Sequence, residues 1–459
     1  MHSTIRGALS VSGVLAVLAA LSTGCSDDGA QTDSADKPTS HRGLGDILVG
    51  GQAVTGSKAT GNKKVPYQRT YSDGALYAPV TGYRSMAYGS AGLEAVYGDV
   101  LSATASGTAS GDVVTTIDPK AQKAAFDALG DRQGAAVALD AESGKLLAVA
   151  STPSYDPATF SGQRPADAAA WKAANADERS PMRNRALHRA GPPDGTFSIV
   201  VAAAALEAGL YKTVDDRTDS PLPYVLPQTT TSVAGSSPRC KDASIRQALR
   251  YSCTTVFAKI AADLGAARLR STAEKFGFND DSLTVPVKVS KSSYPQGDVS
   301  PAEAALTGIG QGTLTATPLE MARVAAVIAN GGRLVAPQMV ERVEKADGST
   351  EKPKTSGGQV EQVVSRDTAD ALRSALKAAA SDVLSQGSDE TESGIGGKTG
   401  QVRDGQDGSA TSWFTAYADG AKGRRIAVTA CVEGLPSGEE EKGTEQAVVV
   451  VEEILASIS

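Results

Sequence analysis

The spacing of apolar residues changes in character along the chain. Residues 42–111 carry short apolar runs broken by glycine-rich turns, as in RGLGDILVGGQAV and GALYAPVTGYRSMAYGSAGLEAVYG. Short runs bounded by turn residues are typical of strands, so this stretch predicts a small module that contains strands. The segment DVVTTID then predicts a strand, and the helix that follows has Pro119 in its first turn.

Two neighbouring apolar runs predict a hairpin. The segment GAAVALDAESGKLLAVASTPSYDP has apolar residues on both sides of a turn from Asp140 to Gly144. Three further apolar strands, in GIGGKTG, TSWFTAYAD and RRIAVTACVE, lie near the end of the chain. Between these two groups the apolar residues have helical spacing over 196–208, 243–264, 301–308, 317–330 and 367–380, and a last helix is predicted over 443–457.

Strands at both ends of a region with helices between them predict an α+β domain over residues 112–459. Its first and last strands should share one antiparallel sheet, with the helices packed around it. Asp194 and Thr196 stand directly before an alanine-rich helical segment, where their side chains are expected to cap the helix. Trp413 and Phe414 are expected in the core.

The first 24 residues have the pattern of an export signal. Arg6 precedes an apolar run over 7–21, and small residues follow up to Cys25. The polar tract 25–41 predicts a tether, and Cys25 resembles the lipid-modified cysteine of bacterial lipoproteins. A cleaved signal without lipid and an uncleaved membrane anchor are the alternatives. All three place the folded part outside the cytoplasm, and we expect it to be anchored to the cell membrane.

Charge and cysteine content narrow the possible partners. The formal net charge is −7, and no run of Lys or Arg is interleaved with aromatic residues, which argues against nucleic acid as a partner. No cysteine spacing suggests a metal site, and no cofactor is expected. Pairing of Cys240 with Cys253 would close a loop of about 15 residues and stabilise the fold by roughly 3 kcal/mol. Separately buried thiols at Cys240, Cys253 and Cys431 are the alternative.

Several segments, taken in order, carry a family resemblance. They are VTTID, GAAVALDAESGKLLAVASTPSYDP, NRAL, SIRQALRYSCTTVFAKIAADLG, GIGQGTLTATPLEMARVAAVIANGG and GGKTG followed by SWFTAYA. Together they resemble the transpeptidase domain of penicillin-binding proteins, the serine acyltransferases that cross-link bacterial peptidoglycan and share the β-lactamase-like fold. The front module, with LYAPVTGY and GLE, is similar to that of class B enzymes of the actinobacterial division type.

The resemblance implies three active-site motifs, of which one is intact. The family's Ser-x-x-Lys opens a helix, and the serine is the nucleophile and the lysine its base. Here the matching segment is PPDGTFS, which puts Gly195 at the serine position and Ser198 at the lysine position. The Ser-x-Asn motif becomes Ser252-Cys253-Thr254, which keeps the serine and replaces the amide by a hydroxyl.

The third motif, Lys-Thr-Gly, is complete at Lys398, Thr399 and Gly400. By resemblance, Lys398, Thr399, Gly400 and Ser252 would bind the terminal carboxylate and amide of a substrate. The residues therefore predict a degenerate transpeptidase of cell-wall synthesis. It would bind a peptidoglycan stem peptide, a β-lactam or a cell-wall synthesis protein without covalent chemistry.

Two other functions remain open. One is an active serine D,D-transpeptidase or carboxypeptidase with a rearranged nucleophile, for which Ser198 and Ser252 are the candidates. The other is a structural partner with a closed cleft.

Overall fold

A computed structural model describes residues 43–102, 110–353, 360–384, 394–403, 408–420 and 423–458. The expected signal 1–24, the tether 25–41 and the lipidation candidate Cys25 lie outside the described residues. Within the described ranges, we find no helix with the length and apolar character needed to cross a membrane.

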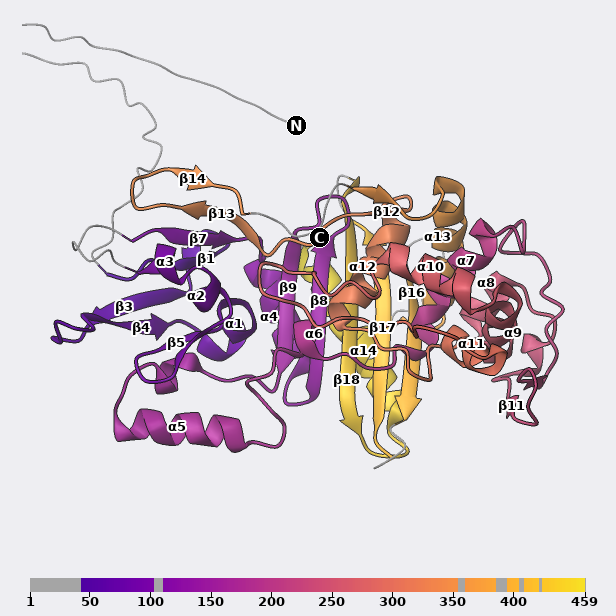
Figure 1. The fold of residues 1–459 in the computed structure, drawn as a ribbon, viewed down its shortest axis with the longest axis horizontal. Coiled ribbons are helices and arrows are strands. Elements are labelled where there is room, and N and C mark those ends of the chain that lie inside the picture. The colour runs from indigo at the N-terminus through magenta and orange to yellow at the C-terminus, as the bar shows by residue number, and fades with distance from the viewer. Residues whose placement is uncertain are drawn as a thin grey trace, which may run out of the picture. The chain divides into compact units, whose positions relative to one another are not determined.

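Five antiparallel strands from the two ends of the region 112–459 form one sheet, as predicted. Their order is β16-β17-β18-β8-β9, and every neighbouring pair is antiparallel. Figure 1 shows the purple strands β8 and β9 beside the yellow strands β16 to β18. The strands are β8 (Gln133–Asp140), β9 (Leu146–Thr152), β16 (Ile395–Arg403), β17 (Ala410–Asp419) and β18 (Arg425–Leu435).

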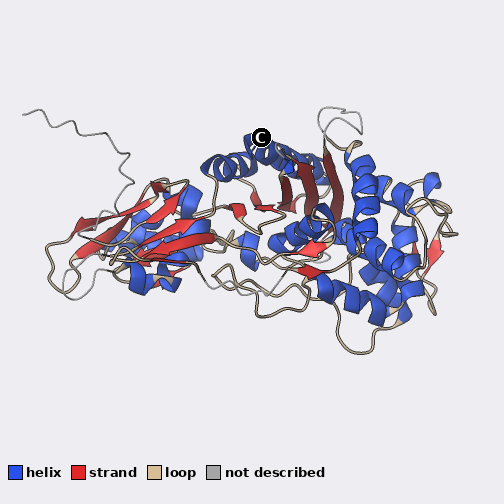
Figure 2. Ribbon diagram, turned by 90° about the horizontal axis from the view of Figure 1, so that it is seen from above, coloured by secondary structure: helices blue, strands red, loops and turns tan. Residues whose placement is uncertain are grey.

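Alternation of side chains along these strands builds two hydrophobic cores. Val137 and Leu139 of β8 belong to the core on one face, and Ala136 and Ala138 belong to the core on the other. Both faces of the sheet are covered by helices, as Figure 2 shows. The covering helices are α12 (Pro318–Ala329) on the first face, and α4 (Pro119–Leu129) and α14 (Glu440–Ile458) on the second. Trp413 and Phe414 are fully buried, which confirms their expected place in the core.

Further helices pack beyond α12 and carry part of the site. The expected single helix over 243–264 is wrong, because the chain breaks at Tyr251 to Cys253 and Ser252 has a left-handed backbone with φ 53°. The helices of this part are α7 (Ser198–Glu207), α8 (Ile245–Arg250), α9 (Thr254–Leu264), α10 (Ala266–Phe276), α11 (Pro301–Gly308) and α13 (Arg366–Ala380).

The front module shares a second sheet with the region that follows it. Its order is β14-β13-β7-β1-β2, and β7 pairs in parallel with β1 and antiparallel with β13. The strands are β1 (Ile47–Val49), β2 (Gln52–Ala53), β7 (Asp112–Thr115), β13 (Val340–Glu344) and β14 (Thr350–Glu351). Beside this sheet, Arg69 is fully buried and forms an ion pair with Glu94 at 2.6 Å.

The remaining elements are short or peripheral. They are β3 (Thr55–Ala59), β4 (Tyr67–Tyr71), α1 (Gly74–Thr81), β5 (Tyr83–Ser85), β6 (Gly89–Ala91), α2 (Leu93–Val96), α3 (Gly98–Leu101), η1 (Pro157–Phe160), α5 (Pro165–Ala176), α6 (Arg185–His188), η2 (Asp194–Phe197), β10 (Tyr224–Val225), β11 (Ser232–Val233), η3 (Pro238–Cys240), β12 (Arg333–Leu334) and β15 (Glu361–Gln362).

Candidate functional site

A cavity of about 270 Å³ lies between η2, the turn that joins α8 to α9, and strand β16. It brings together all seven site residues that the sequence singled out, Gly195, Ser198, Ser252, Thr254, Lys398, Thr399 and Gly400. Five other residues complete its lining, Asp194, Phe257, Ile309, Gln401 and Thr444.

Lys398 supplies a buried amine to this cavity. Its Nζ donates hydrogen bonds to Ser252 Oγ at 2.7 Å and to the Thr399 carbonyl oxygen at 3.0 Å. Burial lowers the pKa of Lys398 to about 8, and the negative charge of Asp194 acts in the opposite direction. Within the described ranges no carboxylate lies within ion-pair distance of Nζ. The lysine is thus a desolvated cation whose charge a ligand can neutralise.

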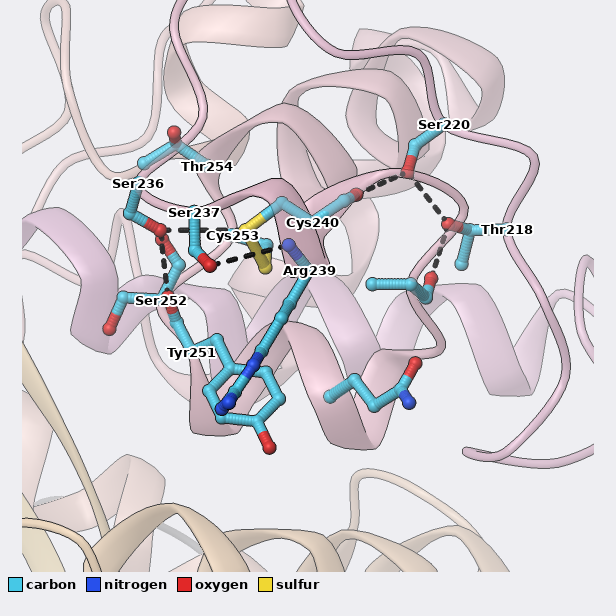
Figure 3. The surroundings of a disulfide bond; sticks show 12 residues. Thr218, Ser220, Ser236, Ser237, Arg239, Cys240, Tyr251, Ser252, Cys253 and Thr254 are labelled. Atoms are coloured by element: carbon cyan, nitrogen blue, oxygen red, sulfur yellow. Dashed lines mark hydrogen bonds between the residues drawn. A yellow bond between two sulfur atoms is a disulfide. The ribbon is translucent and has the colours of Figure 1, made fainter.

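The turn that presents Ser252 is held by a disulfide. Cys253, the residue after Ser252, is bonded to Cys240, with the two Cα atoms 5.3 Å apart. Figure 3 shows the surroundings of this bond, where Ser236 Oγ donates to the Tyr251 carbonyl oxygen at 2.8 Å. These links hold the left-handed backbone of Ser252 in place, a conformation that costs a residue with a side chain roughly 1–2 kcal/mol. The Ser252 hydroxyl therefore has a fixed position beside Lys398.

Thr254 lines the cavity, and its hydroxyl is bonded to a backbone carbonyl. Its Oγ1 donates to the Ala234 carbonyl oxygen at 3.0 Å. Cys431 is a free, buried thiol whose pKa burial raises to about 12. Among the described residues, no three His, Cys, Asp or Glu side chains are grouped to hold a metal ion.

Gly195 lies where two backbones are in close contact. A Cβ atom added to Gly195 would lie 2.8 Å from the Thr399 carbonyl oxygen, and one added to Gly400 would lie 2.7 Å from the Pro193 carbonyl oxygen. Real Cβ atoms essentially never come this near to backbone oxygen, so a side chain at position 195 requires η2 or β16 to shift. The approach of these two elements thus depends on glycine at both positions.

Ser198 is buried, and its Oγ donates to the Gly195 carbonyl oxygen at 2.6 Å. This bond stays within the first helical turn, a common use of a serine at a helix start. Of the two serines, only Ser252 contacts a side chain that can act as a base.

Asp194 has a different role from the one that the sequence predicts. Its carboxylate accepts from the Gln401 backbone N–H at 2.9 Å and from the Gln311 side-chain amide at 3.0 Å. It makes no capping bond to α7 or η2, and Thr196 Oγ1 donates to the Pro193 carbonyl oxygen at 2.6 Å. The capping prediction is wrong because Asp194 binds groups distant in the sequence, and the Thr196 hydroxyl binds the carbonyl oxygen three residues before it.

Gln311 and Gln401 are the partners of Asp194 that sequence reasoning missed, as it missed Phe257, Ile309 and Thr444 in the lining. The two glutamines lie 117 and 207 residues from Asp194 in the chain, so no local pattern connects the three. Only the folded arrangement brings them together.

Comparison with family models places two domains on the chain. Residues 134–456 match the penicillin-binding protein transpeptidase domain, and residues 44–125 match the penicillin-binding protein A dimerisation domain.

Named relatives match over most of the chain. The peptidoglycan D,D-transpeptidase PbpA of Mycobacterium tuberculosis is 34% identical over 422 residues, which cover 85% of this chain and 84% of that protein. The protein of the same name from Mycolicibacterium smegmatis is 33% identical over 420 residues, with 85% and 84% covered.

Solved structures agree with the same grouping. The crystal structure of PBPA from Mycobacterium tuberculosis superposes with a TM-score of 0.82 at 31% identity, covering 91% of this chain and 100% of that one. Its penicillin G acyl-enzyme complex gives a TM-score of 0.81 at 31% identity, with 91% and 100% covered.

Proposed function

Because this chain belongs to the penicillin-binding protein transpeptidase family, as a homologue of its class B members, we propose that it serves peptidoglycan synthesis by binding and not by acyl transfer. The cleft would hold the D-Ala-D-Ala end of a stem peptide, or a β-lactam, without forming a covalent bond. The family resemblance seen in the sequence is confirmed, and the loss of catalysis is proposed.

The contact between η2 and β16 carries this proposal. Gly195 offers no nucleophile, and the Thr399 carbonyl oxygen fills the space into which a side chain would extend. Lys398 and Thr399 nevertheless still line the cavity. A buried cation and a neighbouring hydroxyl can bind a carboxylate when no nucleophile is present, because binding and bond-making use different atoms.

Replacing Lys398 should weaken peptide binding. A hydrogen bond to a charged group is worth about 1.5–3 kcal/mol, so Lys398→Ala should reduce the affinity for N-acetyl-L-Lys-D-Ala-D-Ala by about ten- to a hundred-fold. Isothermal titration calorimetry measures this change, and Lys172→Ala, at an exposed lysine of α5, is the control for loss of a positive charge. The proposal would be contradicted if the native protein does not bind the tripeptide, or if Lys398→Ala leaves the affinity unchanged.

The same interaction should make binding depend on pH. Burial lowers the pKa of Lys398 to about 8, so the amine is charged below that pH and loses its proton above it. The ligand carboxylate stays ionised throughout this range. Affinity should therefore be constant up to about pH 7 and fall by up to about tenfold per pH unit above pH 8. The Lys398→Ala protein should show a flat profile, and an unchanged native affinity at pH 9.5 would refute the assignment.

The contact between Ser252 and Lys398 supports a second candidate function. A hydroxyl 2.7 Å from an amine whose pKa is lowered to about 8 has the elements of a serine–lysine nucleophile. In that case the protein would be a D,D-transpeptidase or carboxypeptidase with a rearranged nucleophile. The Gln401 N–H, a donor that could stabilise a developing oxyanion, is bonded to Asp194 and serves such chemistry only if that carboxylate withdraws.

The proposed cellular setting follows from the sequence. Residues 1–24 act as an export signal and 25–41 as a tether, with Cys25 carrying the lipid that anchors the protein to the cell membrane. Residues 42–111 and 112–459 are the front module and the transpeptidase-like domain, both outside the cytoplasm. Other proteins of cell-wall synthesis are the proposed partners.

A further inference from the structure

One edge of β16 faces the cavity. Among the described strands, β16 pairs only with β17 and ends the sheet, so its other edge lies beside η2 and the cavity instead of a second strand. Thr399 and Gln401 present their groups on that side: the Thr399 carbonyl accepts from Lys398 Nζ, and the Gln401 N–H donates to Asp194. An extended peptide binds such an edge through backbone hydrogen bonds.

Asp194 takes the hydrogen bond that a peptide carbonyl would need. One carboxylate oxygen accepts from the Gln401 N–H at 2.9 Å, and the other accepts from the Gln311 amide at 3.0 Å. The carboxylate is therefore fixed at both oxygens, between the edge of β16 and the loop after α11.

The backbone of Asp194 is held as firmly as its side chain. Its φ of 46° lies in the left-handed region, which is unfavourable for a residue with a side chain. Its N–H donates to the Gly310 carbonyl oxygen at 3.0 Å, and a Cβ atom at Gly310 would lie 1.9 Å from the Asp194 carbonyl oxygen. The surrounding chain thus holds Asp194 in this conformation in the lining of the cavity.

We infer that Asp194 is an internal competitor for the peptide edge of the cleft. Its carboxylate accepts from the Gln401 N–H, and a peptide carbonyl can accept from that N–H only after the Asp194 side chain withdraws. Its negative charge also opposes a second carboxylate near Lys398. This inference rests on the proposed role of the cleft in peptide binding. It makes Asp194 the residue that limits affinity and selects against ligands with additional negative charge.

Binding by Asp194 variants tests the competition. Asp194→Gly removes the competing carboxylate and suits the left-handed backbone, so the affinity for N-acetyl-L-Lys-D-Ala-D-Ala should rise about tenfold in calorimetry. Asp194→Asn keeps an oxygen that can accept from Gln401 and removes only the charge, so its affinity should rise less. An Asp194→Gly protein that binds no better than native protein overturns the inference. An equal rise in both variants overturns the role given to the hydrogen bond.

A matched control separates competition from relief of backbone strain. Asp73 has a similar φ of 49°, makes no side-chain bond at the start of α1 and does not line the cavity. Asp73→Gly should leave tripeptide affinity unchanged, and an affinity rise equal to that of Asp194→Gly would overturn the inference.

If Asp194→Gly fails to fold, Gln311→Ala provides a second test, because it removes one hydrogen bond to the Asp194 carboxylate and keeps Asp194 itself. The tripeptide affinity should rise in this variant too. Unchanged affinity in the folded Gln311→Ala protein would count against the competition.

Hydrogen exchange gives a readout that needs no ligand. The Gln401 amide, followed in overlapping peptides by mass spectrometry, should exchange at least about tenfold faster in Asp194→Gly than in native protein. Added tripeptide should slow it again in the variant. Unchanged exchange overturns the inference. If exchange is faster in Asp194→Gly but no variant binds the tripeptide, the proposed function is refuted. The hydrogen bond between the Gln401 N–H and Asp194 is then still supported.

Discussion

Incubation with benzylpenicillin should leave the mass of the purified protein unchanged for hours. Removing the nucleophile of a serine hydrolase lowers its rate by about 10⁶, or roughly 8 kcal/mol in the barrier, and Gly195 and Ser198 leave this motif without nucleophile and base. Ser198 Oγ is bonded to the Gly195 carbonyl oxygen, and no hydrogen bond joins it to a basic side chain in the described part of the chain. Intact-protein mass spectrometry detects a stoichiometric adduct, and a fluorescent penicillin on a denaturing gel detects a minor one.

The serine variants show which hydroxyl reacts if an adduct forms. An adduct that disappears in Ser252→Ala and persists in Ser198→Ala would establish the rearranged nucleophile and refute binding without chemistry. The back-substitution Gly195→Ser should not restore acylation, because its Cβ would lie 2.8 Å from the Thr399 carbonyl oxygen and position 198 still lacks a lysine.

Removing the Cys240–Cys253 disulfide should lower the free energy of unfolding by about 3 kcal/mol. The bond joins residues 13 apart in the chain, and in the chain-entropy model a loop of this size contributes about that much by restricting the unfolded state. Urea denaturation of the Cys240→Ala, Cys253→Ala double variant measures the loss. The released turn should also weaken tripeptide binding, because Ser252 and Lys398 would lose their fixed separation.

Reducing agent supplies the control for this experiment. With dithiothreitol, the free energy of unfolding of the native protein should fall to nearly that of the double variant. Cys431→Ala should remain as sensitive to reduction as the native protein, since that thiol is free and buried. Equal stability of the native protein and the double variant under oxidising conditions would contradict the prediction.

The sheet was predictable because its signal is local. Residues such as Val137 and Ala138 are apolar on both faces of a strand that helices cover on both sides, and the turn at Asp140 to Gly144 fixes the hairpin. The helix over 243–264 was predicted too long for the opposite reason. Its apolar spacing continues through Ser252, and the disulfide and the left-handed backbone that interrupt it are tertiary features.

The site was predictable in its residue types and not in its contacts. Motif order placed Lys398, Ser252 and Gly195 near one another, and all three line the cavity. Nothing in the sequence indicated that Asp194 binds the Gln401 N–H, because an aspartate before a helix most often caps it. Such a partnership depends on how η2 and β16 approach each other, which the completed fold determines.

The pairing of β8 with β18 determines when the central sheet can be completed during synthesis of the chain. Val137 lies opposite Thr429, so β8 pairs with β9 early but lacks its second neighbour, β18, until nearly the whole chain has been synthesised. Until then β8 and β9 form a bare hairpin with an open edge, which can associate with other chains. A premature stop codon before β18 would therefore yield an aggregation-prone fragment and not a smaller folded domain.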